Sequence, residues 1–196
     1  MFHKKLSYTS LLLLSLGVNT PPLFAAPVIY AQLGSTADQL ATPDTVNQGT
    51  PIMIQNIDSI YGMKWDEKKN KLIINQTGVY VIMADVQVGA RESATNIIKG
   101  GDIYYWINLN NSPIPDTGNW IFASPQARSK TISSTWISPF KKGDVLQFMY
   151  SASSASMGLI TIPPSKNIPN SAGISLSIFM LNNETSPAKT IHSLKN

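Results

Sequence analysis

Carboxylates are the side chains through which this sequence could do chemistry, because general acid–base catalysis and calcium binding both use carboxylate oxygens. Asp85 and Glu92 could form a catalytic pair, and a calcium cluster could be built from Asp102, Asp116 and Asp144. The spacing supports neither arrangement, since no Asp-x-Asp-x-Asp-Gly loop is present and acids on separate strands cannot be paired from sequence. We therefore predict a protein that is not an enzyme and has no metal site or cofactor, with calcium dependence left open.

The cysteine and histidine counts exclude most other site chemistries. The chain has no cysteine, which rules out disulfides, thiol nucleophiles and cysteine-bound zinc. Its two histidines are His3 and His192. His3 lies in the predicted signal peptide, residues 1–26, so the mature subunit would keep one histidine and could not form a histidine triad or a multi-histidine site. The serine-rich segment 151–156 lacks the Gly-x-Ser-x-Gly pattern of a nucleophile elbow and is interpreted as a polar loop available for binding.

Residues 1–26 have the three-part layout of a secretory signal peptide. Lys4 and Lys5 form a basic start, residues 11–16 form an apolar centre, and Ala25 and Ala26 supply small residues at the end. The apolar centre is shorter than the roughly 20 residues that a membrane-spanning helix needs, which favours export over the alternative of a permanent anchor. We expect an exported protein, either secreted or held at the cell surface or in the periplasm, with no membrane span.

The charge balance argues against a nucleic-acid partner. Without residues 1–26 the chain has 13 basic and 11 acidic residues, a net charge of +2. A protein that binds phosphate backbones needs a dense basic face. The basic cluster at residues 64–71 has Asp66 and Glu67 inside it and is interpreted as a solvated turn.

The elements that must position these residues are β-strands. Within residues 79–88, Tyr80, Ile82 and Val86 fall on one face and polar residues fall on the other, the period of two expected for a half-buried strand. Turn residues separate similar β-branched and aromatic runs at residues 52–54, 72–74, 79–88, 103–109, 120–122, 132–137, 145–150, 159–162 and 174–181. No stretch has a capped helical stripe, so we predict an all-β sandwich or closed barrel.

The two ends of the chain lack this pattern. Residues 27–48 have no sustained periodicity and are predicted to be a flexible lead-in. Residues 184–196 are predicted to be a polar C-terminal tail. A single globular domain is therefore expected over residues 49–183.

Four segments carry a resemblance to a known family. Residues 71–82, which contain Gly78-Val79-Tyr80, resemble the strand, turn, Gly-x-Tyr and strand signature of the C1q/TNF-like jelly-roll superfamily. In the same order as in that family, residues 102–111 are similar to a strand with a polar turn, residues 140–148 to a Gly-Asp hairpin, and residues 171–182 to the closing strand. The resemblance spans residues 49–183. It implies a two-sheet jelly roll of about ten strands, without a collagen region, that forms a homotrimer and works by binding.

Aromatic residues on both faces of some strands indicate a second buried surface besides the core. In a trimer this surface would be the subunit interface, where aromatic residues and Met are favoured, whereas in a monomer loops of the same chain would cover it. The aromatic residues expected in the core or the trimer contact are Tyr80, Tyr104, Trp106, Phe148 and Tyr150. The loop residues expected to bind a ligand are Asp116, Asn119, Trp120, Ser153, Ser154 and Met157.

Three functions remain open. The first is a secreted, trimeric C1q-like binding or adhesion protein that recognises an extracellular protein or glycan multivalently, so that weak single contacts add up to stable attachment. The second is a structural surface or coat protein built from the same trimer. The third is a secreted glycan hydrolase that depends on carboxylates, which the absence of cysteine and of histidine outside the leader and the tail disfavours.

Overall fold

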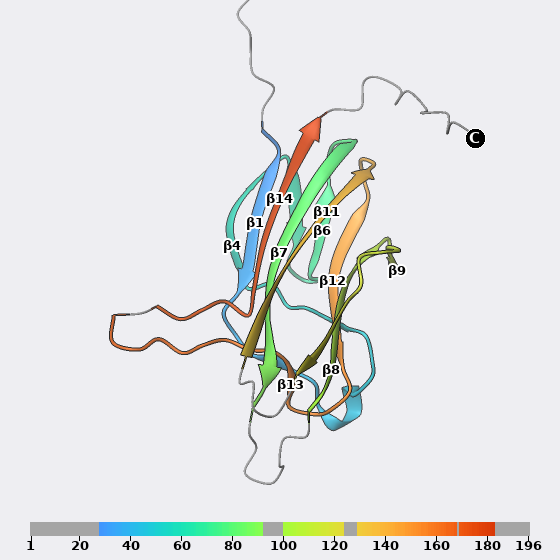
Figure 1. Ribbon diagram of the computed structural model, residues 1–196. Coiled ribbons are helices and arrows are strands. Elements are labelled where there is room, and N and C mark those ends of the chain that lie inside the picture. The colour runs from blue at the N-terminus through green and yellow to red at the C-terminus, as the bar shows by residue number, and fades with distance from the viewer. Residues whose placement is uncertain (1–27, 92–99, 124–128, 168, 183–196) are drawn as a thin grey trace, which may run out of the picture.

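The computed structural model describes residues 28–91, 100–123, 129–167 and 169–182. These residues form two antiparallel sheets packed as a sandwich, together with one short 3-10 turn, η1 (Pro43–Thr45) (Figure 1). The all-β, two-sheet prediction is confirmed. The predicted signal peptide and polar tail, like Glu92 and His192, lie outside the described residues.

The first sheet, here called sheet A, is centred on the long strand β7. Its order is β2-β13-β7-β14-β1-β4, and β11 also pairs with β7. Because the same residues of β7 pair with β14 and with β11, these two strands lie on opposite edges of β7. The strands are β1 (Tyr30–Ser35), β2 (Gln39–Leu40), β4 (Asn56–Tyr61), β7 (Gly78–Ala90), β11 (Ser129–Phe140), β13 (Met157–Leu159) and β14 (Ile174–Asn182).

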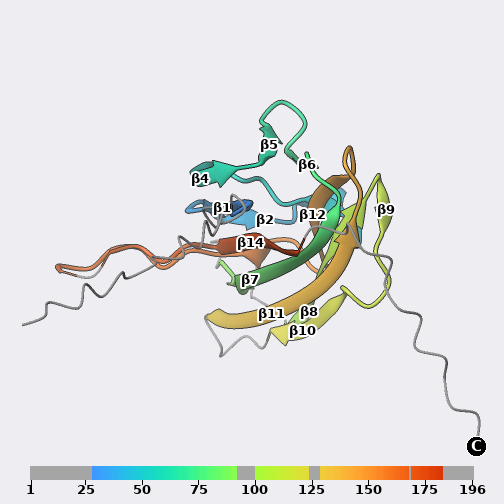
Figure 2. The same ribbon diagram turned by 90° about the horizontal axis from the view of Figure 1, so that it is seen from above.

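The second sheet, sheet B, has the order β10-β8-β12-β6-β5, with β3 pairing with β12 and β9 pairing with β8. Its strands are β3 (Thr50–Pro51), β5 (Met63–Asp66), β6 (Lys71–Ile74), β8 (Gly101–Leu109), β9 (Ser112–Pro113), β10 (Asn119–Ala123) and β12 (Val145–Ala152). Seen from above, β4, β1, β14, β7 and β11 follow one another across sheet A (Figure 2).

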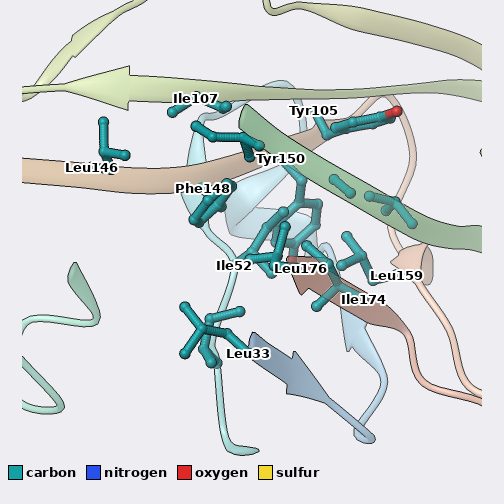
Figure 3. Close-up of a cluster of buried hydrophobic side chains, with 14 of the residues drawn as sticks. Leu33, Ile52, Tyr105, Ile107, Leu146, Phe148, Tyr150, Leu159, Ile174 and Leu176 are labelled. Atoms are coloured by element: carbon teal, nitrogen blue, oxygen red, sulfur yellow. The ribbon is translucent and has the colours of Figure 1, made fainter. Parts of the chain in front are cut away.

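The core lies between the sheets and is built mainly by alternation of inward and outward residues. On β7 the inward residues Tyr80, Ile82 and Val86 are buried, as the period of two predicted. Figure 3 shows Phe148 and Tyr150 of β12 in one cluster with side chains of β14 and with Leu33 of β1. Burial of a large apolar side chain contributes about 1.5–3 kcal/mol each, so this cluster stabilises both sheets together.

The prediction of a flexible lead-in over residues 27–48 was wrong for residues 30–35, which form β1. This strand pairs along its whole length with β14 and also pairs with β4. Its inward side chains are Ala31, Leu33 and Ser35, all buried. Only one of the three is large and apolar, and Gly34 interrupts the opposite face, so six residues carried too weak an alternation to be recognised.

Two other predicted strands differ in the structure. Residues 52–54 are not a strand, although Ile52 N–H donates to Phe148 O at 2.8 Å and Ile54 N–H to Asn70 Oδ1 at 2.9 Å. The strand expected at residues 159–162 ends at Leu159 as β13. Beyond it, residues 162–167 and 169–170 extend away from the sheets to one side in both views (Figures 1 and 2).

Candidate functional site

The outer face of sheet B carries a hollow of about 490 Å³. Alternation on β8 turns Ile103, Tyr105 and Ile107 into the core and leaves Tyr104 and Trp106 on the outer face. These two aromatic residues line the hollow together with Ser151 of β12, the cross-strand partner of Tyr104.

Two segments outside the main strands form the rims of the hollow. Asn47 and Gly49 precede β3, which pairs with β12 on the edge away from β8. Ile114 and Gly118 lie between β9 and β10, and Asn119 begins β10, beyond the other edge of β8. The hollow therefore extends across β12 and β8.

Exposed aromatic side chains extend the floor towards β10. Trp120 lies directly opposite Tyr104 in the register between β10 and β8, and Phe122 follows two residues later on the same face. Trp120 is 61% exposed and Tyr104 is 44% exposed, so both rings are accessible to a ligand. Tyr104, Trp106, Trp120 and Phe122 are called the aromatic platform below.

Hydrogen bonds hold both indole rings of the platform. Trp120 Nε1–H donates to Asp102 Oδ1 at 3.0 Å, and Trp106 Nε1–H donates to Asn108 Oδ1 at 2.8 Å. Since each indole N–H has a partner within the chain, these residues offer their ring faces to an incoming molecule.

Gly49 lies directly over Trp106. A Cβ at position 49 would be 3.0 Å from Cζ2 of Trp106 and 3.8 Å from Cε of Met149. The missing side chain lets Trp106 lie across β12, over Met149, and this packing fixes the ring.

The rim between β9 and β10 is fixed to β8 by a buried threonine. Thr117 Oγ1 accepts from Ile107 N–H at 3.2 Å and donates to Ile114 O at 2.9 Å. The preceding residue, Asp116, has a left-handed φ of 63°, which makes the turn tight. The turn is thus attached to the sheet rather than free in solvent.

A chain of hydrogen bonds joins the same rim to sheet A. Asn119 Nδ2 donates to Thr117 O at 3.2 Å, and Asn119 Oδ1 accepts from Ser134 of β11 at 3.2 Å. Ser134 is also hydrogen-bonded to the hydroxyl of Tyr105, whose ring meets Trp136 edge-on at 6.4 Å. Burial raises the pKa of Tyr105 above its usual value, so its hydroxyl stays protonated to higher pH than that of a solvent-exposed tyrosine.

The predicted ligand-binding loop residues fall in different environments. Asn119 lines the hollow, Trp120 adjoins it, and Asp116 sits in the exposed turn between β9 and β10. Ser153 Oγ accepts from Asp102 N–H at 2.8 Å and so anchors the loop after β12, where Ser154 is half-buried.

Met157 was wrongly expected in an accessible loop. It begins β13, pairs with Ala90 of β7 and is only 1% exposed. The Ser-Ala-rich segment before Met157 predicts a polar loop, and nothing in it indicates that the chain returns to sheet A at Met157.

The predicted aromatic residues divide between core and surface. Tyr80, Phe148 and Tyr150 are buried in the core, where burial raises the pKa of both tyrosines. Tyr104 and Trp106 instead belong to the platform. The second apolar side of β8 is therefore at the protein surface.

Asn47 and Gly49 are among the site residues that sequence reasoning missed, because Asn47 fell inside the predicted lead-in and Gly49 was only the first residue of the predicted domain. The available signal was Asn47-Gln48-Gly49 before Thr50-Pro51, a run of turn residues leading into an extended segment. That signal predicts a turn but not the strand that the turn approaches.

Asp85, Asp102 and Asp144 each accept a hydrogen bond that holds a strand pair, a ring or a turn in place. Asp85 accepts from Ser133 Oγ across β7 and β11, and Asp102 accepts from Trp120. Asp144 Oδ2 accepts from Lys141 N–H at 2.7 Å in the turn before β12. Within the part of the chain that the structure describes, no three His, Cys, Asp or Glu residues come together as a metal-binding group.

A second polar cluster ties Thr161, two residues after the end of β13, to the sandwich. Arg91 donates to Asp38 through Nε at 2.6 Å and Nη2 at 3.0 Å, while Thr161 N–H and Oγ1 reach Asp38 Oδ1 at 2.7 and 2.9 Å. Hydrogen bonding from Arg91, assisted by Thr161, lowers the pKa of Asp38 to about 2. This cluster is called the Asp38 clasp.

The outer face of sheet A carries a different surface, here called the apolar row. Tyr61 pairs with Tyr30, Tyr30 with Phe179, Phe179 with Val81, and Val81 with Ile137. Five apolar side chains on five neighbouring strands thus lie level across the sheet. Tyr30, Tyr61 and Ile137 are exposed, Phe179 is half-buried, and Val81 at the centre of the row is buried.

A scan against protein-family models and a search of curated proteins gave no match to this chain. Among the residues that the structure describes, no helix has the length and apolar character needed to span a membrane.

Proposed function

We propose that this chain is an exported jelly-roll protein of the C1q/TNF-like type that assembles as a homotrimer and binds an extracellular protein or glycan multivalently. The observation that carries the proposal is the apolar row across the outer face of sheet A. The aromatic platform and hollow on sheet B remain accessible for the ligand.

The strand order supports the jelly-roll part of the proposal. The chain passes from β7 in sheet A to β8 in sheet B, returns from β10 to β11, and crosses again from β11 to β12. The first long strand, β1, lies beside the last, β14. Repeated crossing between two sheets with the ends adjacent is the connectivity expected of a jelly roll.

The apolar row supports self-association. Contiguous apolar surface on a soluble protein marks an interaction site, and aromatic residues are enriched at the centres of interfaces. Met83, two residues after Val81 on β7, is also exposed. The apolar surface therefore extends along β7 as well as across the sheet. Threefold symmetry comes from the resemblance of residues 49–183 to C1q/TNF-like proteins.

A trimer would give the binding site its strength. A trimer presents three copies of one hollow on a rigid assembly. Once one hollow has bound, binding by the other two is intramolecular, which raises the overall avidity without any new contact. This arrangement suits attachment to a surface that displays many copies of one ligand.

The test is the molar mass of the protein lacking residues 1–26, measured by light scattering during gel filtration over a dilution series. A mass of three subunits that persists on dilution is expected. A mass of one subunit at every concentration would overturn the proposal.

A further inference from the structure

We propose that the hollow on sheet B binds a neutral oligosaccharide, with one hexose ring lying against Trp120 and Tyr104. This inference rests on the proposed function in one respect: it names the class of ligand that the same site binds.

The aromatic platform offers the surface that a sugar ring needs. Trp120 and Tyr104 are direct cross-strand partners, so their side chains lie next to each other on one face. The carbon-bound hydrogens on the flat face of a pyranose can pack on aromatic rings whose electron-rich faces are exposed. Because Asp102 holds the indole N–H of Trp120, the ring is oriented before a ligand arrives.

The polar lining suits hydroxyl groups. The amide of Asn47 both donates and accepts hydrogen bonds, as do the hydroxyls of Ser151 and Tyr104. A sugar hydroxyl likewise donates and accepts, so it can be matched by either kind of group. The volume of about 490 Å³ falls in the range of small-molecule sites, roughly 300–1,000 Å³.

The charges favour a neutral sugar over an anionic one. None of the described residues that line the hollow is charged. Asp102, which accepts a hydrogen bond from Trp120, would repel a carboxylate or sulfate placed on that ring.

The site is less suited to a peptide. Its floor is the broad face of sheet B, where the backbone groups of β8 are paired with β10 and β12 on both edges. An extended peptide therefore cannot add as a strand there, and its backbone would face aromatic rings. The rims fixed by Thr117 and Asn119 also reduce the ordering cost for a small ligand.

The experiment uses ¹⁵N-labelled protein lacking residues 1–26 and follows the indole N–H signals of its tryptophans during titration. The probes are hexamers of β-1,4-linked glucose, β-1,4-linked N-acetylglucosamine, β-1,4-linked mannose and β-1,4-linked galactose, with a sulfated heparin hexasaccharide for comparison. We expect saturable shifts of the Trp120 and Trp106 signals with at least one neutral hexamer.

Variants then locate the site. Trp120→Ala and Tyr104→Ala are each expected to weaken binding about tenfold or more. Met53→Ala is the control, because Met53 is an exposed apolar residue outside the hollow, and it should bind like the unaltered protein.

The inference is overturned if no neutral hexamer shifts the indole signals, if heparin binds better than every neutral hexamer, or if Trp120→Ala and Tyr104→Ala both bind normally. The molar mass of the same samples separates this outcome from failure of the proposed function. A trimer without sugar binding refutes only the ligand class, whereas a sugar-binding monomer refutes only the assembly.

Discussion

The outer faces of the two sheets both expose apolar side chains, yet they are shaped for different contacts. On sheet A the apolar row lies level across five strands, from Tyr61 to Ile137. On sheet B the aromatic platform is flanked by rims at Gly49 and Asn119 and encloses a hollow. A level row suits another broad surface such as a second subunit, whereas a rimmed hollow with amide and hydroxyl groups suits a small polar ligand.

The difference arises from the connections rather than from the strands. Both faces follow the same alternation of inward and outward residues. The turn between β9 and β10 is tied to β8 by Thr117, and the segment before β3 reaches Trp106 through Gly49. These two short connections convert an aromatic surface into a site.

Removing a core side chain that lies between the two sheets should have the largest effect on the free energy of unfolding. Phe148→Ala is expected to lower the free energy of unfolding by about 3–5 kcal/mol, because the ring is buried between the sheets. Chemical denaturation measures this loss, and subunit assembly and sugar binding should fail together as the fold weakens. A fully stable variant would show that the two faces do not share this core.

Removing Trp106, a large side chain that lines the hollow, should lower the stability of the protein without dissociating the subunits. Trp106→Ala is expected to lower the free energy of unfolding by about 2 kcal/mol, less than for a fully buried ring because Trp106 is half-buried. Thermal unfolding and light scattering on the same sample test this. A fall in molar mass at low protein concentration would break the comparison, since it would place Trp106 in the subunit interface.

The rim before β3 can be tested with two glycines on opposite rims of the hollow. Gly49→Ala should cost about 1 kcal/mol because its Cβ would press on the Trp106 ring at 3.0 Å. Gly118→Ala is the control, since a Cβ there meets nothing within 4 Å. Equal melting temperatures for the two variants would contradict the close packing of Gly49 on Trp106.

The Asp38 clasp lies outside both outer faces, and removing it should have the smallest effect on the free energy of unfolding. The pKa of Asp38 is lowered to about 2 in the folded protein, compared with about 3.9 in an unfolded chain. A lowered folded pKa contributes stability that is present above pH 4 and is lost as the pH falls from about 4 to 2. Because the pair is partly exposed, we expect a contribution below about 1 kcal/mol.

Asp38→Asn should therefore reduce the loss of melting temperature between pH 4 and pH 2 relative to the unaltered protein. Asp58→Asn, an exposed residue of β4 outside the clasp, serves as the control. Identical pH profiles for Asp38→Asn and the unaltered protein would refute a stabilising clasp.

Periodicity predicted most of the core but little of the site. Alternation on β7 correctly placed Tyr80 and Ile82 inside, because a long strand with large apolar residues carries a strong pattern. The short β1 carries small residues at two of its three inward positions, so its pattern was too weak. Segment length and side-chain size thus limited the fold prediction.

The site depends on contacts that alternation does not encode. The outward position of Tyr104 could be predicted from β8 alone, but its pairing with Trp120 depends on the register between β8 and β10. The approach of Gly49 to Trp106 depends on how β3 joins β12. Both contacts are long-range, and no local propensity specifies them.

The most direct test of the division between the two faces is the molar mass of a matched pair of variants, Ile137→Asp and Phe122→Asp, in the protein lacking residues 1–26. Ile137 is 66% exposed on sheet A and Phe122 is 55% exposed on sheet B, so each change places a charge at an accessible apolar position. Light scattering over a dilution series should show that Ile137→Asp dissociates to single subunits at concentrations where Phe122→Asp remains a trimer. Dissociation of Phe122→Asp with an intact Ile137→Asp trimer, or no trimer in the unaltered protein, would contradict this account.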